Sequence, residues 1–195
     1  AAVAAAIAAL GLVVGFAIAE RFKPQRRFIG LMMGLGAGVL TAVVAYALVL
    51  ETVESSERTW LVGAGLSAGA LVFYFGSQWL DGHFAAPTGD DESSSAGAGL
   101  PLALGAVLDG IPESMVIGIA AALTGEISVP LVIAAFIANT SESLAATPDL
   151  EESKISRNQV LLIWVAIVTA SVLTAILGYE VISGLSREGG AIFNG

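Results

Sequence analysis

Cysteine is absent from this 195-residue chain, and charged side chains make up only 13% of it. Without cysteine there is no disulfide, no thiolate metal site and no thiol redox chemistry. Soluble domains carry about 25% charged residues, so the charge needed to coat a soluble surface is nearly halved here. Together with 56% hydrophobic residues and a mean hydropathy of +0.85, this shortage excludes a soluble enzyme and a disordered chain. We expect an integral membrane protein surrounded by a lipid bilayer.

Basic side chains are also scarce. Eight Lys and Arg residues stand against 17 Asp and Glu residues, which gives a net charge of −9 at pH 7. An acidic chain of this kind is a poor ligand for nucleic acid or for anionic lipid headgroups, so we expect no nucleic-acid partner. Histidine occurs once, at His83, which lies outside the long apolar runs of the sequence.

The chain contains six long apolar runs. The run at 28–50 has no charged residue, and about 20 apolar residues cross the hydrocarbon core of a bilayer. The runs are continuous and roughly twice as long as a membrane β-strand, so helices fit better than a β-barrel. The sequence predicts an all-α integral membrane protein, a single transmembrane domain over 1–195, built as a bundle of about six helices. These helices are expected at 1–19, 28–50, 60–80, 100–123, 127–147 and 160–182.

The segments between the runs have the composition of loops. Residues 81–99 are polar and acidic, cannot bury a core, and are predicted to form a mobile loop. Pro148 is expected to end the fifth helix. Within the second run, Gly30, Gly34 and Gly38 are four residues apart, a spacing that lets two helix backbones approach closely. We expect these glycines to pack helices together.

The orientation of the chain is predicted from Lys and Arg, which are favoured in cytoplasmic loops. The loops after the first, third and fifth helices hold six of these residues, and the segments after the other helices hold two. This asymmetry places the N-terminus outside and the 81–99 loop in the cytoplasm. The expected location is the plasma membrane of a prokaryote.

Three acidic residues lie inside predicted helices: Asp109 and Glu113 in the fourth, and Glu142 in the fifth. One such acid costs about 2.5–3.5 kcal/mol at the bilayer centre, so three cost about 8–10 kcal/mol by addition. All eight Lys and Arg residues lie in loops or at helix ends, so no basic partner offsets this cost. Two ways of offsetting the cost remain: protonation of the acids, or a bound cation. A further alternative is that the acids are neutral and hydrogen-bonded to Ser and Thr across helices.

The spacing of the polar residues favours a binding site. Asp109 and Glu113 are four residues apart and share one helix face, as Asn139 and Glu142 do at a spacing of three. Pro112 has no N–H group, so the carbonyl oxygen it leaves unpaired, four residues earlier, is a further acceptor beside Asp109. Only a very short turn separates the two helices, so both acid-bearing faces are expected at matching depth.

All the atoms of this predicted site are oxygens. The expected metal ligands and their auxiliary residues are Asp109, Glu113, Asn139 and Glu142, with Ser114, Ser143 and Pro112 beside them. Oxygen ligands suit hard ions such as Mg²⁺, Ca²⁺ and Mn²⁺. Zinc also accepts carboxylates, although it usually binds His or Cys. The residues leave Zn, Mn, Mg and Ca open as the ion.

Two motifs in these helices resemble those of the ZIP family of metal-ion transporters. The family's fourth helix carries His-Asn-x-Pro-Glu-Gly; Pro112 and Glu113 match it, and Asp109 stands where the family has His. In the fifth helix, Glu142 matches the glutamate of the family's Gln/His-x-x-Pro-Glu-Gly motif, and Asn139 falls on its second polar position.

The glycine-rich stretch 34–40 is also similar to the second helix of that family. The resemblance implies a transporter that takes divalent metal cations from outside, binds them between the fourth and fifth helices and releases them to the cytoplasm by rocking of helix bundles. Because the family usually has eight spans, the resemblance implies a ZIP-like fold that lacks two C-terminal helices.

No covalent chemistry is implied, so we expect that the protein is not an enzyme and that the metal ion is its substrate. Two alternatives use the same residues. In the first, the acids relay protons in a proton-coupled or proton-conducting carrier. In the second, the chain is a non-transporting ZIP-like membrane scaffold. The sequence leaves assembly as a homo-oligomer open.

Overall fold

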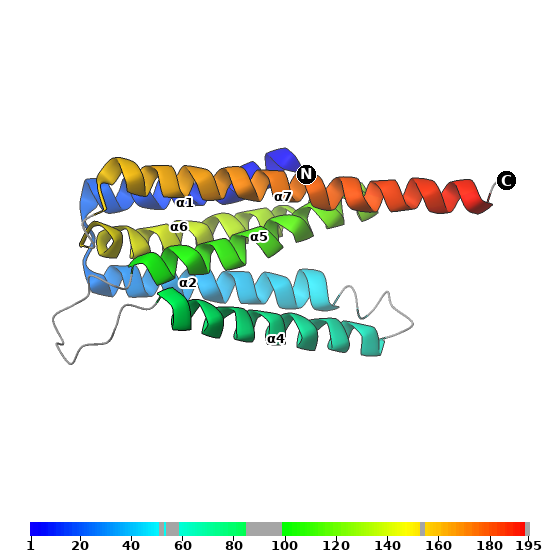
Figure 1. Cartoon of the computed structure of the whole chain (residues 1–195), viewed down its shortest axis with the longest axis horizontal. Coiled ribbons are helices and arrows are strands. Elements are labelled where there is room, and N and C mark those ends of the chain that lie inside the picture. The colour runs from blue at the N-terminus through cyan, green and yellow to red at the C-terminus, as the bar shows by residue number, and fades with distance from the viewer. Residues whose placement is uncertain (51–52, 54–58, 85–98, 153–154, 194–195) are drawn as a thin grey trace.

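The structure is a computed structural model that describes residues 1–50, 53, 59–84, 99–152 and 155–193. All regular elements in these ranges are helices, and Figure 1 shows them with their long axes roughly aligned. In chain order they are α1 (Ala2–Phe22), α2 (Arg26–Val43), the π-helical turn η1 (Val44–Leu50), α4 (Thr59–Phe84), α5 (Gly99–Thr124), α6 (Val129–Glu152) and α7 (Arg157–Phe193).

Five of the described helices are long and apolar enough to cross a membrane. Their apolar spans are Ala2–Phe22, Arg26–Tyr46, Gly105–Thr124, Val129–Glu152 and Arg157–Leu185. The expected all-α membrane bundle is therefore confirmed in its class. The third expected helix corresponds to α4, whose apolar stretch Trp60–Gly76 is shorter. A total of six membrane-spanning helices stays a prediction.

The largest differences from the expected helix boundaries are at the C-terminal ends of α4, α6 and α7. α6 continues through Pro148 to Glu152, so the prediction that this proline ends the helix is wrong. Proline removes one backbone hydrogen bond, but Leu150, fully buried beyond it, anchors the last turn in the core. α7 runs on to Phe193, and α4 includes residues 81–84 of the expected loop. Gly99, the last residue of the expected loop, begins α5, and residues 85–98 lie outside the described residues.

Four helices, α1, α5, α6 and α7, form the packed centre of the bundle, and glycines bring two pairs of them close. A Cβ atom built on Gly11 or Gly15 of α1 would collide with backbone oxygens of α6. One built on Gly118 of α5 would collide with the carbonyl of Ala175 in α7, and one on Gly178 would approach α5 within 2.8 Å. We call α1 with α6, and α5 with α7, the two glycine-locked pairs.

α2 and α4 lie outside this centre. α2 packs on α6, where a Cβ on Gly36 would lie 3.1 Å from the Cα of Ala138. No described atom lies within 4 Å of a Cβ built on Gly30, Gly34 or Gly38, so the prediction that these three pack helices together is wrong within this chain. Residues four apart share a face, and no other helix of the described chain covers these glycines closely.

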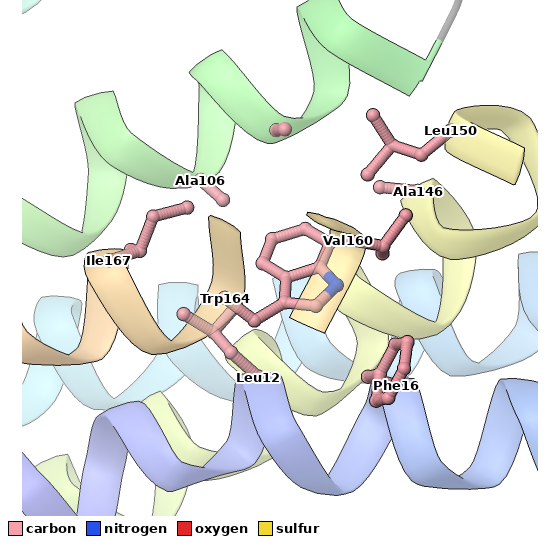
Figure 2. Close-up of a cluster of buried hydrophobic side chains, with 9 residues drawn as sticks. Leu12, Phe16, Ala106, Ala146, Leu150, Val160, Trp164 and Ile167 are labelled. Atoms are coloured by element: carbon pink, nitrogen blue, oxygen red, sulfur yellow. The ribbon is translucent and has the colours of Figure 1, made fainter. Parts of the chain in front are cut away.

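Two clusters of buried apolar side chains lie at different heights in the bundle. The larger surrounds Trp164, which is fully buried (Figure 2). The indole N–H of Trp164 donates to Thr147 Oγ1 over 3.3 Å. The buried members of this cluster are Leu12, Phe16, Ala103, Ala106, Ala146, Leu150, Val160, Trp164 and Ile167. The second cluster contains Ala4, Ala8, Ile117, Leu131, Val132 and Ala135. We call them the Trp164 cluster and the Leu131 cluster.

Candidate metal centre

The three intramembrane acids lie between the two apolar clusters. On α5, Asp109 and Glu113 fall between Ala106, in the Trp164 cluster, and Ile117, in the Leu131 cluster. On α6, Glu142 likewise lies between residues of the Leu131 cluster and residues of the Trp164 cluster. The acids therefore form a polar layer that is closed above and below by apolar side chains.

The structure brings these three carboxylates near one another. Glu142 interacts electrostatically with both Asp109 and Glu113, and Glu113 interacts with Asp109. Like charges in one apolar layer repel, and water does not screen them as it does at a surface. The predicted meeting of the acid-bearing faces of the fourth and fifth helices is thus observed.

Two carboxylate oxygens in this layer have no hydrogen-bond partner among the described residues. Glu113 Oε1 and Glu142 Oε2 are buried, and neither accepts a hydrogen bond in the described part of the chain. No described Lys or Arg forms an ion pair with any of the three acids; Arg157, for example, pairs with Glu20 at the end of the bundle. A buried acceptor without a donor loses the hydration free energy that it would have in water. This loss is largest when the acceptor is charged.

The hydroxyl and amide groups near Glu142 donate to backbone carbonyls. Ser143 Oγ donates to Asn139 O of its own helix over 3.1 Å, and Asn139 Nδ2 donates to Ala8 O of α1 over 3.1 Å. Ser141 Oγ donates to Met32 O of α2 over 2.8 Å. None of these donors reaches a carboxylate, so the alternative in which Ser and Thr satisfy the acids has no support among the described residues.

These contacts show that two of the residues predicted to surround Glu142 face another helix. Ser143 faces Gly15 of α1, and Asn139 also faces α1, so neither side chain lines the cavity beside Glu142. Their grouping with Glu142 as a metal ligand and an auxiliary oxygen is not observed. On α5, Ser114 is buried next to Glu113.

Pro112 lies within a continuous helix α5. Because proline has no N–H group, the carbonyl of Leu108 lacks its usual intrahelical donor there. This carbonyl neighbours Asp109 in the sequence, as predicted, and adds an acceptor to the polar layer.

A cavity of about 230 Å³ opens beside the acids between α2, α5 and α6, and we call it the site cavity. Its lining residues are Met33, Ala37, Leu40, Thr41, Asp109, Ala138, Ser141 and Glu142. At about 30 Å³ per water molecule, this volume accommodates a partly hydrated ion. The sequence patterns did not indicate Met33, Thr41 or Ser141 as site residues; the signal for Thr41 is a hydroxyl in an otherwise charge-free apolar run.

The carboxylate oxygens suit a hard cation, but the acids that carry them are divided between the two glycine-locked pairs. Asp109 and Glu113 belong to the α5–α7 pair, and Glu142 belongs to the α1–α6 pair. In this conformation no group of three or more His, Cys, Asp or Glu side chains among the described residues is close enough to hold a metal ion. A cation bound by all three carboxylates therefore requires α5 and α6 to approach or these side chains to turn toward one another.

Comparison with known proteins gives no match, neither to a protein family nor to a curated protein nor to a solved structure. The likeness to the ZIP family thus rests on the residues of α2, α5 and α6 described above.

Proposed function

We propose that this protein transports divalent metal cations across a membrane and binds them between α5 and α6. The observation that carries the proposal is the pair of buried carboxylate oxygens, Glu113 Oε1 and Glu142 Oε2, to which no described group donates a hydrogen bond. A divalent cation offsets both the missing hydrogen bonds and the repulsion among the acids. Asp109 is the third carboxylate, and it reaches the layer from the exposed side of α5.

The two glycine-locked pairs suggest how binding is coupled to movement. Glycine contacts hold the helices of each pair together, so each pair moves as a unit. The cation attracts Glu142 on one pair and Asp109 and Glu113 on the other, which draws the pairs together around it. Release requires them to separate, and alternation between these arrangements exposes the ion to one side of the membrane and then to the other.

Hydroxyl oxygens complete the coordination. Thr41 and Ser141 line the site cavity with Asp109 and Glu142, so a bound ion would meet oxygens from α2, α5 and α6. Oxygen-only coordination favours Mn²⁺, Mg²⁺ or Ca²⁺ relative to a site with nitrogen ligands, and Zn²⁺ retains its intrinsic affinity. The transporter proposed here resembles the ZIP family, with its N-terminus outside and its location in the plasma membrane of a prokaryote.

A titration of the purified protein in detergent with Mn²⁺ or Cd²⁺ tests the proposal. Glu113→Gln and Glu142→Gln should each weaken binding by about 10- to 100-fold, since an interaction with a charged group contributes about 1.5–3 kcal/mol. The matched control is Glu126→Gln, because Glu126 is exposed near the turn between α5 and α6. The Glu126→Gln variant should bind Mn²⁺ or Cd²⁺ with the same affinity as the unmodified chain.

Flux measurements in proteoliposomes distinguish the alternatives. Proton flux that needs the same acids but no metal would replace the proposal with a proton carrier. A chain that binds no metal and moves no protons would be a scaffold. Metal flux that disappears in Glu142→Gln and persists in Glu126→Gln supports the transporter.

A further inference from the structure

A second cavity lies in the groove between α2 and α6, nearer the end of the bundle. It has a volume of about 400 Å³, and we call it the end cavity. Its lining residues are Pro24, Arg26, Ile29, Gly30, Met33, Ala145, Pro148, Asp149 and Glu152. Met33 also lines the site cavity, and it is the residue common to the two described linings.

The two cavities follow one face of each helix. On α2 the lining positions proceed from Arg26 through Met33 to Thr41 in steps of three or four residues, and on α6 they proceed from Ala138 to Glu152 in the same way. Residues at this spacing share a stripe, so the two cavities lie end to end along one groove and meet at Met33. The seven residues from Met33 to Arg26 span about 10 Å at 1.5 Å per residue.

The groove leads to a charged end of the bundle. A third cavity of about 400 Å³ shares Pro24, Pro148 and Glu152 with the end cavity and adds Lys23 and Glu151. The acids on these two linings, Asp149, Glu151 and Glu152, outnumber the bases Lys23 and Arg26 by one, and Arg26 interacts electrostatically with Asp149. This end is hydrated by its charges and does not present a positive barrier to a cation.

Two clusters of buried apolar side chains occupy the described interior of the bundle. The Trp164 cluster packs between α1, α5, α6 and α7 on one side of the acids, and the Leu131 cluster packs between α1, α5 and α6 on the other. Trp164 itself is fully buried and hydrogen-bonded to Thr147. An ion leaving the polar layer along the bundle axis would have to displace close-packed apolar side chains.

We infer that the groove between α2 and α6 is an aqueous route between the intramembrane acids and the Arg26 end of the bundle, and that the Met33 side chain is its constriction. The use of this route by metal ions rests on the proposed function. Methionine has three rotatable side-chain bonds, so a change of rotamer at Met33 opens or closes the connection without moving a helix. The route explains why the groove stays open at both its cavities while the bundle interior is packed.

The lack of native cysteine allows a direct test with single-cysteine variants. Ile29→Cys and Ala145→Cys place a thiol in the end cavity, and Ala37→Cys places one in the site cavity. Leu31→Cys is the control at similar depth, because Leu31 is 74% exposed and does not line the groove. Each variant is reconstituted in liposomes and treated with a positively charged, membrane-impermeant methanethiosulfonate from the side that holds Arg26.

The expected result is fast labelling at Ile29→Cys, Ala145→Cys and Ala37→Cys. Labelling at Leu31→Cys should be slower by about 100-fold, because a charged reagent is excluded from the hydrocarbon. Equal, slow labelling at all four positions would show a groove filled by lipid and would overturn the route. Labelling does not depend on transport, so fast labelling in a protein that binds no metal would keep the route and reject the proposed function.

Substitution at Met33 tests the constriction. Met33→Trp should slow labelling of Ala37→Cys and leave Ile29→Cys unchanged, which also shows that the variant folds. Leu35→Trp is the matched control on the same helix, since Leu35 is 51% exposed and outside both linings. Met33→Trp should reduce Mn²⁺ flux while Mn²⁺ binding persists. Unchanged labelling of Ala37→Cys in Met33→Trp would exclude Met33 as the constriction.

Discussion

The hydroxyl of Ser141 in α6 donates a hydrogen bond to the carbonyl oxygen of Met32 in α2 over 2.8 Å, at the position in the sequence directly before Glu142. The same hydroxyl donates to Ile137 O of its own helix, so it bridges the two backbones. A Cβ on Gly36 would lie 2.9 Å from this hydroxyl, which shows that the absence of a side chain there allows the contact. The hydrogen bond therefore fixes how closely α2 covers the site cavity.

Gly36→Ala should destabilise the protein by about 1–3 kcal/mol, the usual cost of an extra methyl group in a packed contact. Its Cβ would meet Ser141 and the backbone of Ala138, and a backbone cannot turn away as a side chain can. Gly34→Ala is the control, because no described atom lies within 4 Å of its Cβ and alanine is the better helix former. Thermal unfolding in detergent measures both. Equal midpoints for the two variants would contradict the packing of α2 on α6.

Trp164→Phe should destabilise the bundle by about 1 kcal/mol through loss of the hydrogen bond to Thr147, plus the smaller volume. Trp164→Ala should cost about 3–5 kcal/mol, because it leaves a cavity in the centre of the Trp164 cluster. The control is Trp60→Phe on α4, where the side chain is exposed. A midpoint for Trp164→Ala close to that of Trp60→Phe would mean that this cluster does not hold the bundle together.

Asp109→His should shift the preference of the site toward Zn²⁺ over Mn²⁺, since an imidazole nitrogen replaces a hard, charged oxygen. Asp109→Ala should weaken the binding of every divalent ion. Loss of a contact of about 1.5 kcal/mol lowers the affinity by about tenfold or more. Competition titrations on the unmodified chain and both variants give the ratio of affinities. A Zn²⁺ to Mn²⁺ ratio that Asp109→His leaves unchanged would remove Asp109 from the ligand set.

Metal binding should weaken as the pH falls from 8 to 5, because protons compete with the cation for the carboxylates. The effect has this sign because protonation removes the charge that binds the metal. Glu142→Gln should show a shallower dependence, since one competing group is gone. Titrations at several pH values in matched ionic strength provide the measurement. An affinity that is independent of pH over this range would exclude a site made of carboxylates.

The sequence was sufficient to predict the membrane class and the acids of the candidate site for one physical reason. An apolar run of bilayer length is costly to expose to water, and a charge inside such a run is costly to place in lipid, so each pattern has few interpretations. Asp109, Glu113 and Glu142 could therefore be selected without a structure. The same reasoning predicted that the helices bearing them meet.

The rotation of each helix about its axis could not be predicted in this way. Lipid chains are as apolar as leucine, so hydropathy does not separate the lipid-facing side of α2 from the side that packs. Gly30 and Gly36 are equally plausible contacts by spacing, and the structure uses Gly36. For the same reason Asn139 was grouped with Glu142, although its amide faces Ala8 of α1.

The bond between Asn139 and Ala8 joins residues 131 positions apart, which bears on the order of assembly during synthesis. At about 5–20 residues per second, α1 waits about 7–26 s in the membrane before the partner it packs against has been made. During that interval its glycine face is open to lipid or to other helices. A delay at this stage would prolong the time that α1 spends without the helix on which its packing depends.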